Sequence, residues 1–217
     1  MAIKPILFNT EMVRANLDGR KRCTRRICKD ANEYTVPDMD FFDPEKRTYA
    51  VHNYADKEHK IKLSIAERNC PICPGDILYV RESYSELSFG YVYKADGENI
   101  DHLGNVIKWH PSIHMPKEAA RIWLKVTDVR VERLQDITEE QACMEGTDPW
   151  DEVCYENNGW HPTFSDPDSG GDPNMVDGFH KLWNSTIKKS DLDRYSWDAN
   201  PWVWVIEFER CEKPEGV

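Results

Sequence analysis

Apolar and polar residues follow short, distinct patterns along the first thirty positions of the chain. The apolar run at 4–8 (KPILF) predicts a strand. Asn9 and Thr10 then supply helix-capping side chains, and Gly19 is a typical helix end. The segment at 23–27 (CTRRI) predicts the next strand. The chain is therefore expected to begin as strand, short helix and strand.

Three later segments have patterns that are typical of strands. Residues 77–80 (ILYV) form a continuous apolar run, which predicts a buried strand that carries Arg81 and Glu82 at its far end. The segment 122–131 has apolar residues at regular intervals and predicts a long strand, and 201–210 (PWVWVIEFER) predicts a final one.

Two helices are expected in the second half. Thr138 and Gln141 fit a capping box, and Gly146 closes the helix that they begin. Residues 175–187 carry apolar side chains at helical spacing. This order of strands and helices predicts a mixed α+β fold around a curved sheet or small barrel.

Two stretches show no periodic signal. Residues 30–70 combine scattered charge with few apolar positions, and 147–173 are rich in Pro, Gly and Asp. We expect an irregular insertion in the first and a long surface loop in the second. The 217 residues then suit a single domain, 1–217, with these two insertions.

Composition narrows the class of protein. Hydrophobic residues make up 40% of the chain and include eight Trp, so a packed core is expected. No apolar run approaches the roughly 20 residues of a membrane span, and the first residues do not resemble a secretory signal. Seven cysteines form an odd number without the spacing of a disulfide scaffold. Reduced thiols and a cytoplasmic location are the expectation.

Charge is distributed unevenly. The formal net charge is -11, but residues 1–30 carry +5 and residues 136–217 carry -13. Bulk duplex DNA is an unlikely partner for such an acidic chain, because sequence-independent affinity comes from neutralised phosphates. A small basic pocket would still suit a modified nucleoside or single-stranded RNA.

The basic residues gather at one place, with five of them between Arg20 and Arg26. Lysine acts as a base only when its pKa falls from about 10.4 toward 7–8, and neighbouring positive charges lower it. A threonine hydroxyl is a nucleophile only when a base takes its proton. Lys21 and Thr24 are thus a candidate base and nucleophile, with Arg26 as a candidate oxyanion donor. The alternative is a basic strand on the surface.

Four further residues are candidates for the same site. Glu145 lies in the last turn of its expected helix, where the helix dipole disfavours a carboxylate by roughly 0.3–1 kcal/mol. A locally unfavourable choice favours function, although surface glutamates often break this rule. Arg81 and Glu82 follow a buried strand and form either a binding site or an ordinary rim ion pair. His114 lies in a proline-bounded loop, where it faces a pocket or bonds the backbone.

A metal site is not expected. Cys70 and Cys73 supply two of the four ligands that zinc requires. The other two would be His110 and His114, more than thirty residues away and outside the usual spacing. Loop cysteines are the favoured interpretation and zinc binding is the alternative that the sequence leaves open, and no cofactor is expected.

Taken together, five segments resemble the ASCH-domain family of the PUA-like superfamily, particularly its phage and prophage branch. They cover 92 of the 217 residues, in the expected order. The segments are KPILFNTEMVRANLDGRKRCTRR, PGDILYVRES, WHPSIHMPKEAARIWLKVTDVRVERLQDITEEQACMEG, FHKLWNS and WDANPWVWVIEFER.

The resemblance implies a small mixed β-barrel with peripheral helices that binds RNA or modified nucleosides. In the bacterial N4-acetylcytidine amidohydrolase of this family, the motif is GRK-x-x-T-x-R with a glutamate late in a helix. By that similarity Thr24 would be the nucleophile, Lys21 its base and Glu145 the proton carrier to the leaving amine. Arg26 would stabilise the oxyanion, and Arg81 would contact a phosphate or base edge.

The chain is about twice the size of that amidohydrolase, and its PSIHMP and WDANPW segments have no counterpart there. An amidohydrolase acting on an acylated cytidine-type nucleoside is the first functional prediction. A non-catalytic module that binds RNA or a modified nucleotide is the alternative. A third hypothesis is protein binding through the acidic residues 136–217. The oligomeric state stays open.

Overall fold

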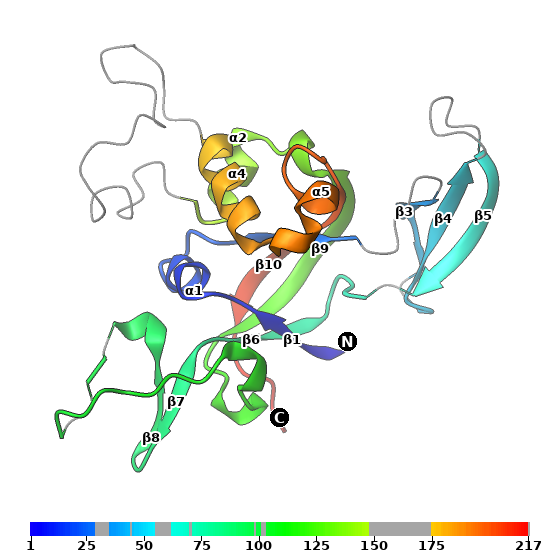
Figure 1. Cartoon of the computed structure of the whole chain (residues 1–217). Coiled ribbons are helices and arrows are strands. Elements are labelled where there is room, and N and C mark those ends of the chain that lie inside the picture. Colours follow the sequence, from blue (N-terminus) through cyan, green and yellow to red (C-terminus); the bar gives the residue numbers. More distant parts are fainter. Residues whose placement is uncertain are drawn as a thin grey trace, which may run out of the picture. The chain divides into compact units, whose positions relative to one another are not determined.

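The computed structural model describes residues 1–28, 35–43, 45–54, 62–69, 71–97, 99–100, 103–147 and 175–216. These residues form a mixed α+β protein, as the sequence predicts (Figure 1). The chain divides into two compact units: the first comprises 1–22, 74–128 and 207–217, and the second comprises 23–73 and 129–206.

Parallel and antiparallel pairing combine in the first unit. Strand β1 (Ile3–Leu7) runs parallel to β6 (Ile77–Arg81), with Ile3 opposite Ile77. Strand β6 is antiparallel to β9 (Trp123–Arg133), with Ile77 opposite Lys125. The order of strands in the larger sheet is β1-β6-β9-β10-β2, in which β10 spans Trp202–Cys211 and β2 spans Cys23–Ile27. The division between units falls within β9 and within β10 (Trp202–Cys211).

Helix α1 (Thr10–Leu17) begins where the sequence predicts it. The Asn9 side chain accepts a hydrogen bond from the Met12 backbone N–H at 2.8 Å, and this capping satisfies one of the first backbone donors. Gly19 follows the helix with φ +78°, a conformation that glycine adopts without strain. The turn therefore directs the chain from α1 into the basic segment.

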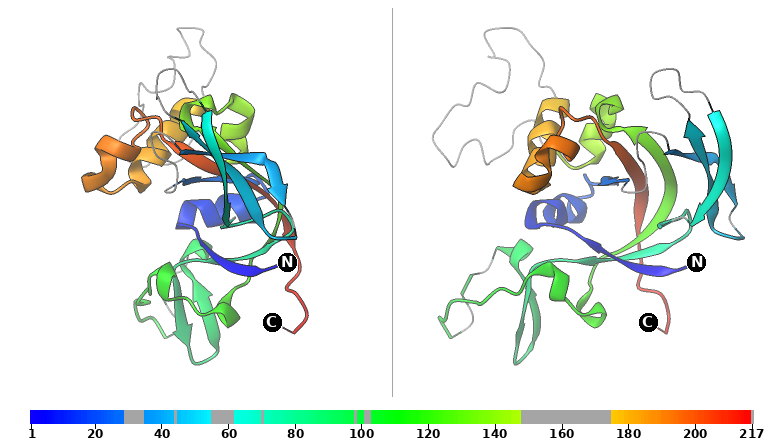
Figure 2. Two further views of the ribbon diagram at one scale, coloured as in Figure 1. Left: turned by 90° about the vertical axis from the view of Figure 1, so that its right-hand side faces the viewer. Right: turned by 45° about the vertical axis from the view of Figure 1, so that its right-hand side comes forward.

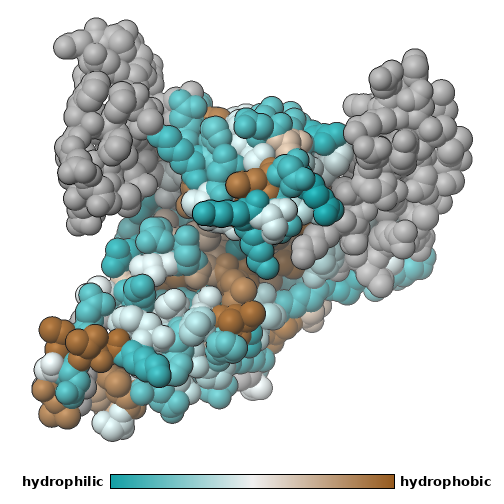
Figure 3. All heavy atoms as spheres, in the orientation of Figure 1, coloured by the Kyte–Doolittle hydropathy of each residue, from teal (hydrophilic) through white to brown (hydrophobic). Residues whose placement is uncertain are grey.

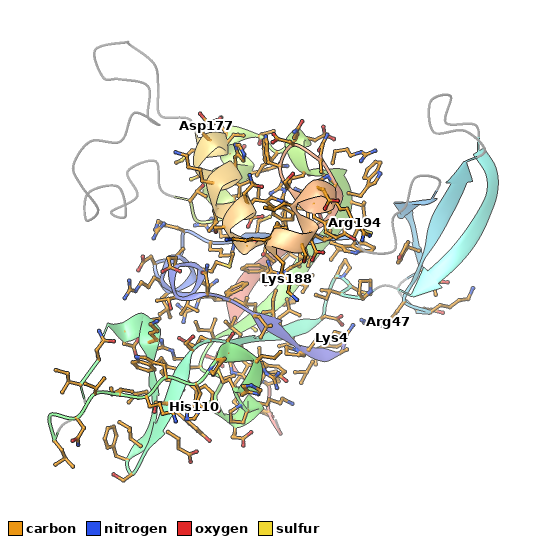
Figure 4. All side chains as sticks on the ribbon, in the orientation of Figure 1. Lys4, Arg47, His110, Asp177, Lys188 and Arg194 are labelled. Atoms are coloured by element: carbon orange, nitrogen blue, oxygen red, sulfur yellow. The ribbon has the colours of Figure 1, made fainter. Side chains whose placement is uncertain are left out.

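The core of the first unit lies between β6, β9 and the strands and short helices connecting them. These are β7 (Tyr84–Leu87), β8 (Gly90–Tyr93), η1 (Lys94–Asp96), η2 (Ser112–His114) and η3 (Lys117–Ala119). Its buried cluster consists of Ile77, Tyr79, Tyr84, Met115, Ala119, Ala120 and Trp123. At its edge, buried Asp76 accepts from the Ala2 N–H at 2.8 Å and pairs with Lys4, which Figure 4 labels.

Helices cover the core of the second unit. Strand β2 (Cys23–Ile27) belongs to this unit. The helices of the unit are η4 (Leu134–Asp136), α2 (Glu139–Met144), α4 (Met175–Thr186), η6 (Lys189–Asp191) and α5 (Leu192–Tyr195). Their buried cluster consists of Cys23, Leu134, Ile137, Ala142, Phe179, Trp183, Val203 and Val205. Phe179 and Trp183 come from one face of α4, because residues four apart in a helix lie side by side.

The expectation that 30–70 is irregular is wrong. Strands β3 (Thr35–Asp43), β4 (Thr48–Tyr54) and β5 (Lys62–Asn69) form a three-stranded antiparallel sheet (Figure 2). Buried Tyr49 packs edge-on against Trp204 at 5.2 Å between ring centroids. Pairing with the neighbouring strand stabilises these strands. Such pairing does not require a regular alternation of apolar and polar side chains, so the sequence pattern did not predict it. The expected loop at 147–173 lies, apart from Thr147, outside the described residues.

Within the described residues, the strands form open sheets of five, three and two strands and no closed barrel. The mixed α+β class is thus confirmed at the coarse level. No helix in that part of the chain is both long and apolar enough to span a bilayer.

A group of apolar side chains lies on the surface of the first unit (Figure 3). Ile100, Leu103 and Val106 are all exposed in the segment after η1. A bridge between Ile100 and Val106 closes this segment, and the Ile107 N–H donates to the Asn99 carbonyl at 2.9 Å.

Candidate functional site

The Glu145 carboxylate is buried beside strand β2. Its side chain is 3% exposed and that of Arg25 is fully buried. Arg25 Nη1 donates to Glu145 Oε1 at 3.3 Å, and Cys23 Sγ lies 3.8 Å from the same oxygen. Cys23 and Arg25 are alternate residues of a strand, so both side chains leave the same face of β2. Two chain segments 120 residues apart thus meet at one carboxylate.

Helix α2 positions this carboxylate. Thr138 Oγ1 accepts from the Gln141 N–H at 3.2 Å, and Gln141 Oε1 accepts from the Thr138 N–H at the same distance, which completes the predicted capping box. Glu145 is the C-cap residue, and Gly146 ends the helix with φ +84°. Gln141 and Glu145 are four residues apart and therefore face β2 together. Gln141 Oε1 also accepts from Arg25 Nη2 at 2.7 Å.

Thr24 lies in the middle of the same strand with no exposed surface. Its hydroxyl oxygen has no hydrogen-bond partner in the part of the chain that the structure describes. A buried hydroxyl without a partner costs about 1–3 kcal/mol. Such groups are rare in folded proteins, and each calls for an explanation, of which a catalytic role is one.

Arg26 leaves β2 on the same side as Thr24, because it is the next alternate residue. This is the face opposite to that of Cys23 and Arg25, which contact Glu145. It is half-buried, and its Nη1 donates to the Arg25 carbonyl at 3.0 Å. Burial lowers the pKa of Arg26, and the negative charge of Glu145 partly opposes this. In the described residues, no hydrogen bond joins the Thr24 hydroxyl to Glu145 or to Lys21.

Lys21 belongs to the first unit and is 1% exposed. Its N–H donates to the Ala15 carbonyl at 2.9 Å, and its carbonyl accepts from Asn16 Nδ2 at 3.1 Å. Its ammonium nitrogen lies 5.5 Å from the centroid of the Phe8 ring. The end of α1 therefore holds the Lys21 backbone, three residues before Thr24 in the chain.

The alternative of a basic strand on the surface is wrong for two of the five basic residues. Arg20 and Arg22 are exposed, but Lys21 and Arg25 are buried. Burying a cation costs several kcal/mol unless partners compensate. Lys21 and Arg25 are therefore interior cations that depend on partners within the fold.

Glu82 does not form a rim ion pair with its neighbour Arg81. The Glu82 carboxylate is buried and accepts from Arg121 instead, and burial raises the pKa of Glu82 although Arg121 opposes this. Arg81 Nη1 donates to the Ile113 carbonyl at 3.2 Å, and its guanidinium carbon lies 5.6 Å from the centroid of the Tyr79 ring. Arg81 and Glu82 are thus held by different partners.

The His114 side chain is exposed, and its backbone carbonyl accepts from the Tyr84 hydroxyl at 3.1 Å. Cys73 is buried, whereas Cys70 lies outside the described residues. Among the residues that the structure describes, no group of three or more His, Cys, Asp or Glu side chains could hold a metal ion.

Sequence reasoning missed Arg25 and Arg121. Arg25 was one of several cationic neighbours, and Arg121 was part of a long strand segment. Each is distinguished by a carboxylate partner that is distant in the chain. Strand alternation from Cys23 would have placed Arg25 on the core face, but no sequence signal names Glu145 as its partner.

No family model matches this chain, and no curated protein and no solved structure matches it either. The functional conclusion therefore rests on the motifs and on the geometry above.

Proposed function

We propose that the protein is an ASCH-type amidohydrolase with a PUA-like fold, which removes an acyl group from the exocyclic amine of a cytidine-type nucleoside. One observation carries the proposal: the Thr24 hydroxyl is buried without a hydrogen-bond partner in the described residues, in the segment that resembles the family's catalytic motif. Activation of this hydroxyl requires a base within hydrogen-bond reach, so the proposal needs Lys21 to reach Thr24 when the substrate binds.

The proposed reaction has two stages. In the first, Lys21 takes the hydroxyl proton of Thr24 while Oγ1 bonds to the acyl carbon. The C–N bond then breaks, and the proton that Lys21 took passes through Glu145 to the leaving amine. In the second stage, water hydrolyses the acyl ester of Thr24, which releases a carboxylic acid and restores the hydroxyl.

Arg26 supports the charge that develops in both stages. It leaves the Thr24 side of β2 and lies within electrostatic range of Glu145. An oxyanion donor of this kind contributes roughly 3–4 kcal/mol to the transition state. Thr24 has no exposed surface and leaves the face of β2 opposite to the one that Glu145 contacts. Substrate entry therefore requires the groups around Thr24 to move, so that its hydroxyl and Glu145 reach the same substrate.

The test is hydrolysis of N4-acetylcytidine by the purified protein, followed as release of cytidine. Thr24→Ala and Lys21→Ala are expected to abolish turnover while both variants remain folded. Arg22→Gln is the matched control from the same basic segment, because Arg22 is exposed. Absence of turnover by the wild type, or full activity of Thr24→Ala, would contradict the proposal.

The complete burial of Thr24 favours a second candidate function, a non-catalytic module that binds RNA or a modified nucleotide. A module of this kind has no need for an accessible nucleophile. It predicts binding of single-stranded RNA that weakens as salt rises, because phosphate contacts release counterions. Binding that is unchanged in Thr24→Ala, together with no hydrolysis, would favour this function.

A further inference from the structure

We propose that Arg25 is a positioning residue that sets the orientation of the Glu145 carboxylate. The inference rests on the proposed function, in which Glu145 delivers a proton to the leaving amine. It adds a residue that the GRK-x-x-T-x-R pattern leaves unspecified, since Arg25 occupies one of its variable positions.

Three acceptors surround the Arg25 guanidinium. Nη1 donates to Glu145 at 3.3 Å, and Nη2 donates to Gln141 at 2.7 Å and to Glu132 at 3.4 Å. The ring of Phe179 lies 5.7 Å from the guanidinium carbon. A guanidinium is planar and its donors point in fixed directions. Contacts to β9 and α2 therefore fix the plane of the group that contacts Glu145.

Orientation of the carboxylate follows from which oxygen is contacted. Arg25 Nη1 and Cys23 Sγ both reach Oε1 of Glu145. Glu145 is the C-cap of α2: its N–H donates to the Gln141 and Ala142 carbonyls, and the Gly146 N–H donates to the Cys143 carbonyl. With one end held by the helix and one oxygen held by Arg25, the side chain has little rotational freedom. A proton carrier needs this restriction, because transfer requires hydrogen-bond distance to the amine.

Stability alone does not explain the arrangement. Buried ion pairs are often no more stabilising than apolar side chains of similar volume, because desolvation offsets the attraction. The Arg25 Nε–H is also buried without a hydrogen-bond partner among the described residues, which adds a further cost. A group retained in an unfavourable network is expected to serve the site that it contacts.

The main experiment measures kcat and KM for N4-acetylcytidine hydrolysis in Arg25→Lys, which keeps the charge and loses the planar fork. We expect kcat to fall about 10–100-fold with KM changed less than about twofold, because misplacing a reacting group costs up to about 10²-fold. Arg133→Lys is the matched control. Arg133 donates to the Asn200 carbonyl in the same unit and has no contact with Glu145 in the described residues.

Gln141→Glu gives a second variant that avoids a folding defect. A glutamate at this position retains the capping box. Its carboxylate would compete with Glu145 for the Arg25 guanidinium, whose shortest contact is to Gln141. We expect a melting temperature close to that of the wild type and a kcat reduced about 10-fold. A residue with a purely structural role would leave kcat unchanged.

The outcomes separate the two proposals. An inactive wild type would contradict the proposed function and, with it, the role of Arg25. An active wild type with kcat unchanged in both Arg25→Lys and Gln141→Glu would overturn the positioning role alone. In a Glu145→Gln background, Arg25→Lys is expected to lower kcat less than twofold further. A full additional loss there would show that Arg25 acts independently of Glu145 and would also overturn the inference.

Discussion

Arg121 donates two parallel hydrogen bonds to Glu82, from Nε to Oε1 at 2.9 Å and from Nη2 to Oε2 at 3.0 Å. Its Nη1 donates to Asp96 at 3.0 Å, and its guanidinium carbon lies 4.0 Å from the centroid of the Tyr93 ring. Bidentate pairs of this kind are stronger and more specific than single contacts. The carboxylate at the end of β6 is thus part of a network that joins three segments of the first unit.

This network predicts a specific pH dependence of stability. Burial raises the pKa of Glu82 above its ordinary value of 4.5, so the native state binds this proton more tightly than the unfolded chain. The stabilisation from that proton is fully present below the unfolded pKa and is lost as pH rises through the folded pKa. Glu82→Gln is expected to remove this dependence.

The measurement is urea unfolding of the wild type and Glu82→Gln at a series of pH values from 4 upward, about half a unit apart. The free energy of unfolding of the wild type should fall relative to the variant across the window above the ordinary pKa. Glu86→Gln is the control, because Glu86 is an exposed residue of β7. Parallel curves for the wild type and Glu82→Gln would contradict the prediction.

Thr24→Val should separate stability from activity. Valine has the shape of threonine but no hydroxyl, and the hydroxyl oxygen of Thr24 is buried without a partner in the described residues. We expect the free energy of unfolding to rise by about 1 kcal/mol, because the desolvation cost disappears, while turnover is lost. Chemical denaturation and the cytidine-release assay measure the two effects.

Thr138→Val is the matched control for that substitution. The Thr138 hydroxyl accepts from the Gln141 N–H as the N-cap of α2, so its loss is expected to cost about 1 kcal/mol. The free energy of unfolding is therefore expected to rise in Thr24→Val and to fall in Thr138→Val. A Thr24→Val variant that is destabilised as much as Thr138→Val would show that the Thr24 hydroxyl has a structural partner.

Arg26→Gln is expected to reduce kcat by about 10²–10³-fold if Arg26 stabilises the oxyanion. An arginine guanidinium stays protonated in proteins, so the ratio of wild-type kcat to Arg26→Gln kcat should be constant between pH 6 and about 9. Steady-state kinetics across that range measure both effects. An Arg26→Gln variant within about twofold of the wild type would remove Arg26 from the proposed mechanism.

Asn200 has the left-handed φ of +44° and joins three hydrogen bonds at the start of β10. Its N–H donates to the Trp197 carbonyl, its Oδ1 accepts from the Gln135 N–H, and its carbonyl accepts from Arg133. Asn200→Ala is expected to cost about 2 kcal/mol, because alanine is strained at this φ and the side-chain hydrogen bond is lost. Asn200→Gly should cost about half as much, because only the hydrogen bond is lost. Equal costs, measured by urea unfolding, would show that the backbone conformation contributes nothing.

Local signals in the sequence located several elements correctly. Asn9 begins α1, Thr138 and Gln141 form their capping box, and β2 spans Cys23–Ile27 as expected. These elements depend on hydrogen bonds between residues three or four positions apart and on strand alternation, so their causes are visible in a short window. The motif residues Lys21, Thr24 and Glu145 were proposed from local chemistry and local resemblance, and their roles stay a prediction.

Distant contacts decided the rest. Strands β3 to β5 form by pairing across an antiparallel sheet, and no short window of their polar sequence indicates it. The sequence placed Arg25 among five neighbouring cations, but only folding brought it to Glu145, 120 residues away, and left the Thr24 hydroxyl buried without a partner in the described chain. Burial sets the cost of each charge and hydroxyl, and burial depends on which distant segments pack together. The amino-acid sequence therefore determined which groups are available, and the tertiary structure decided which of them meet.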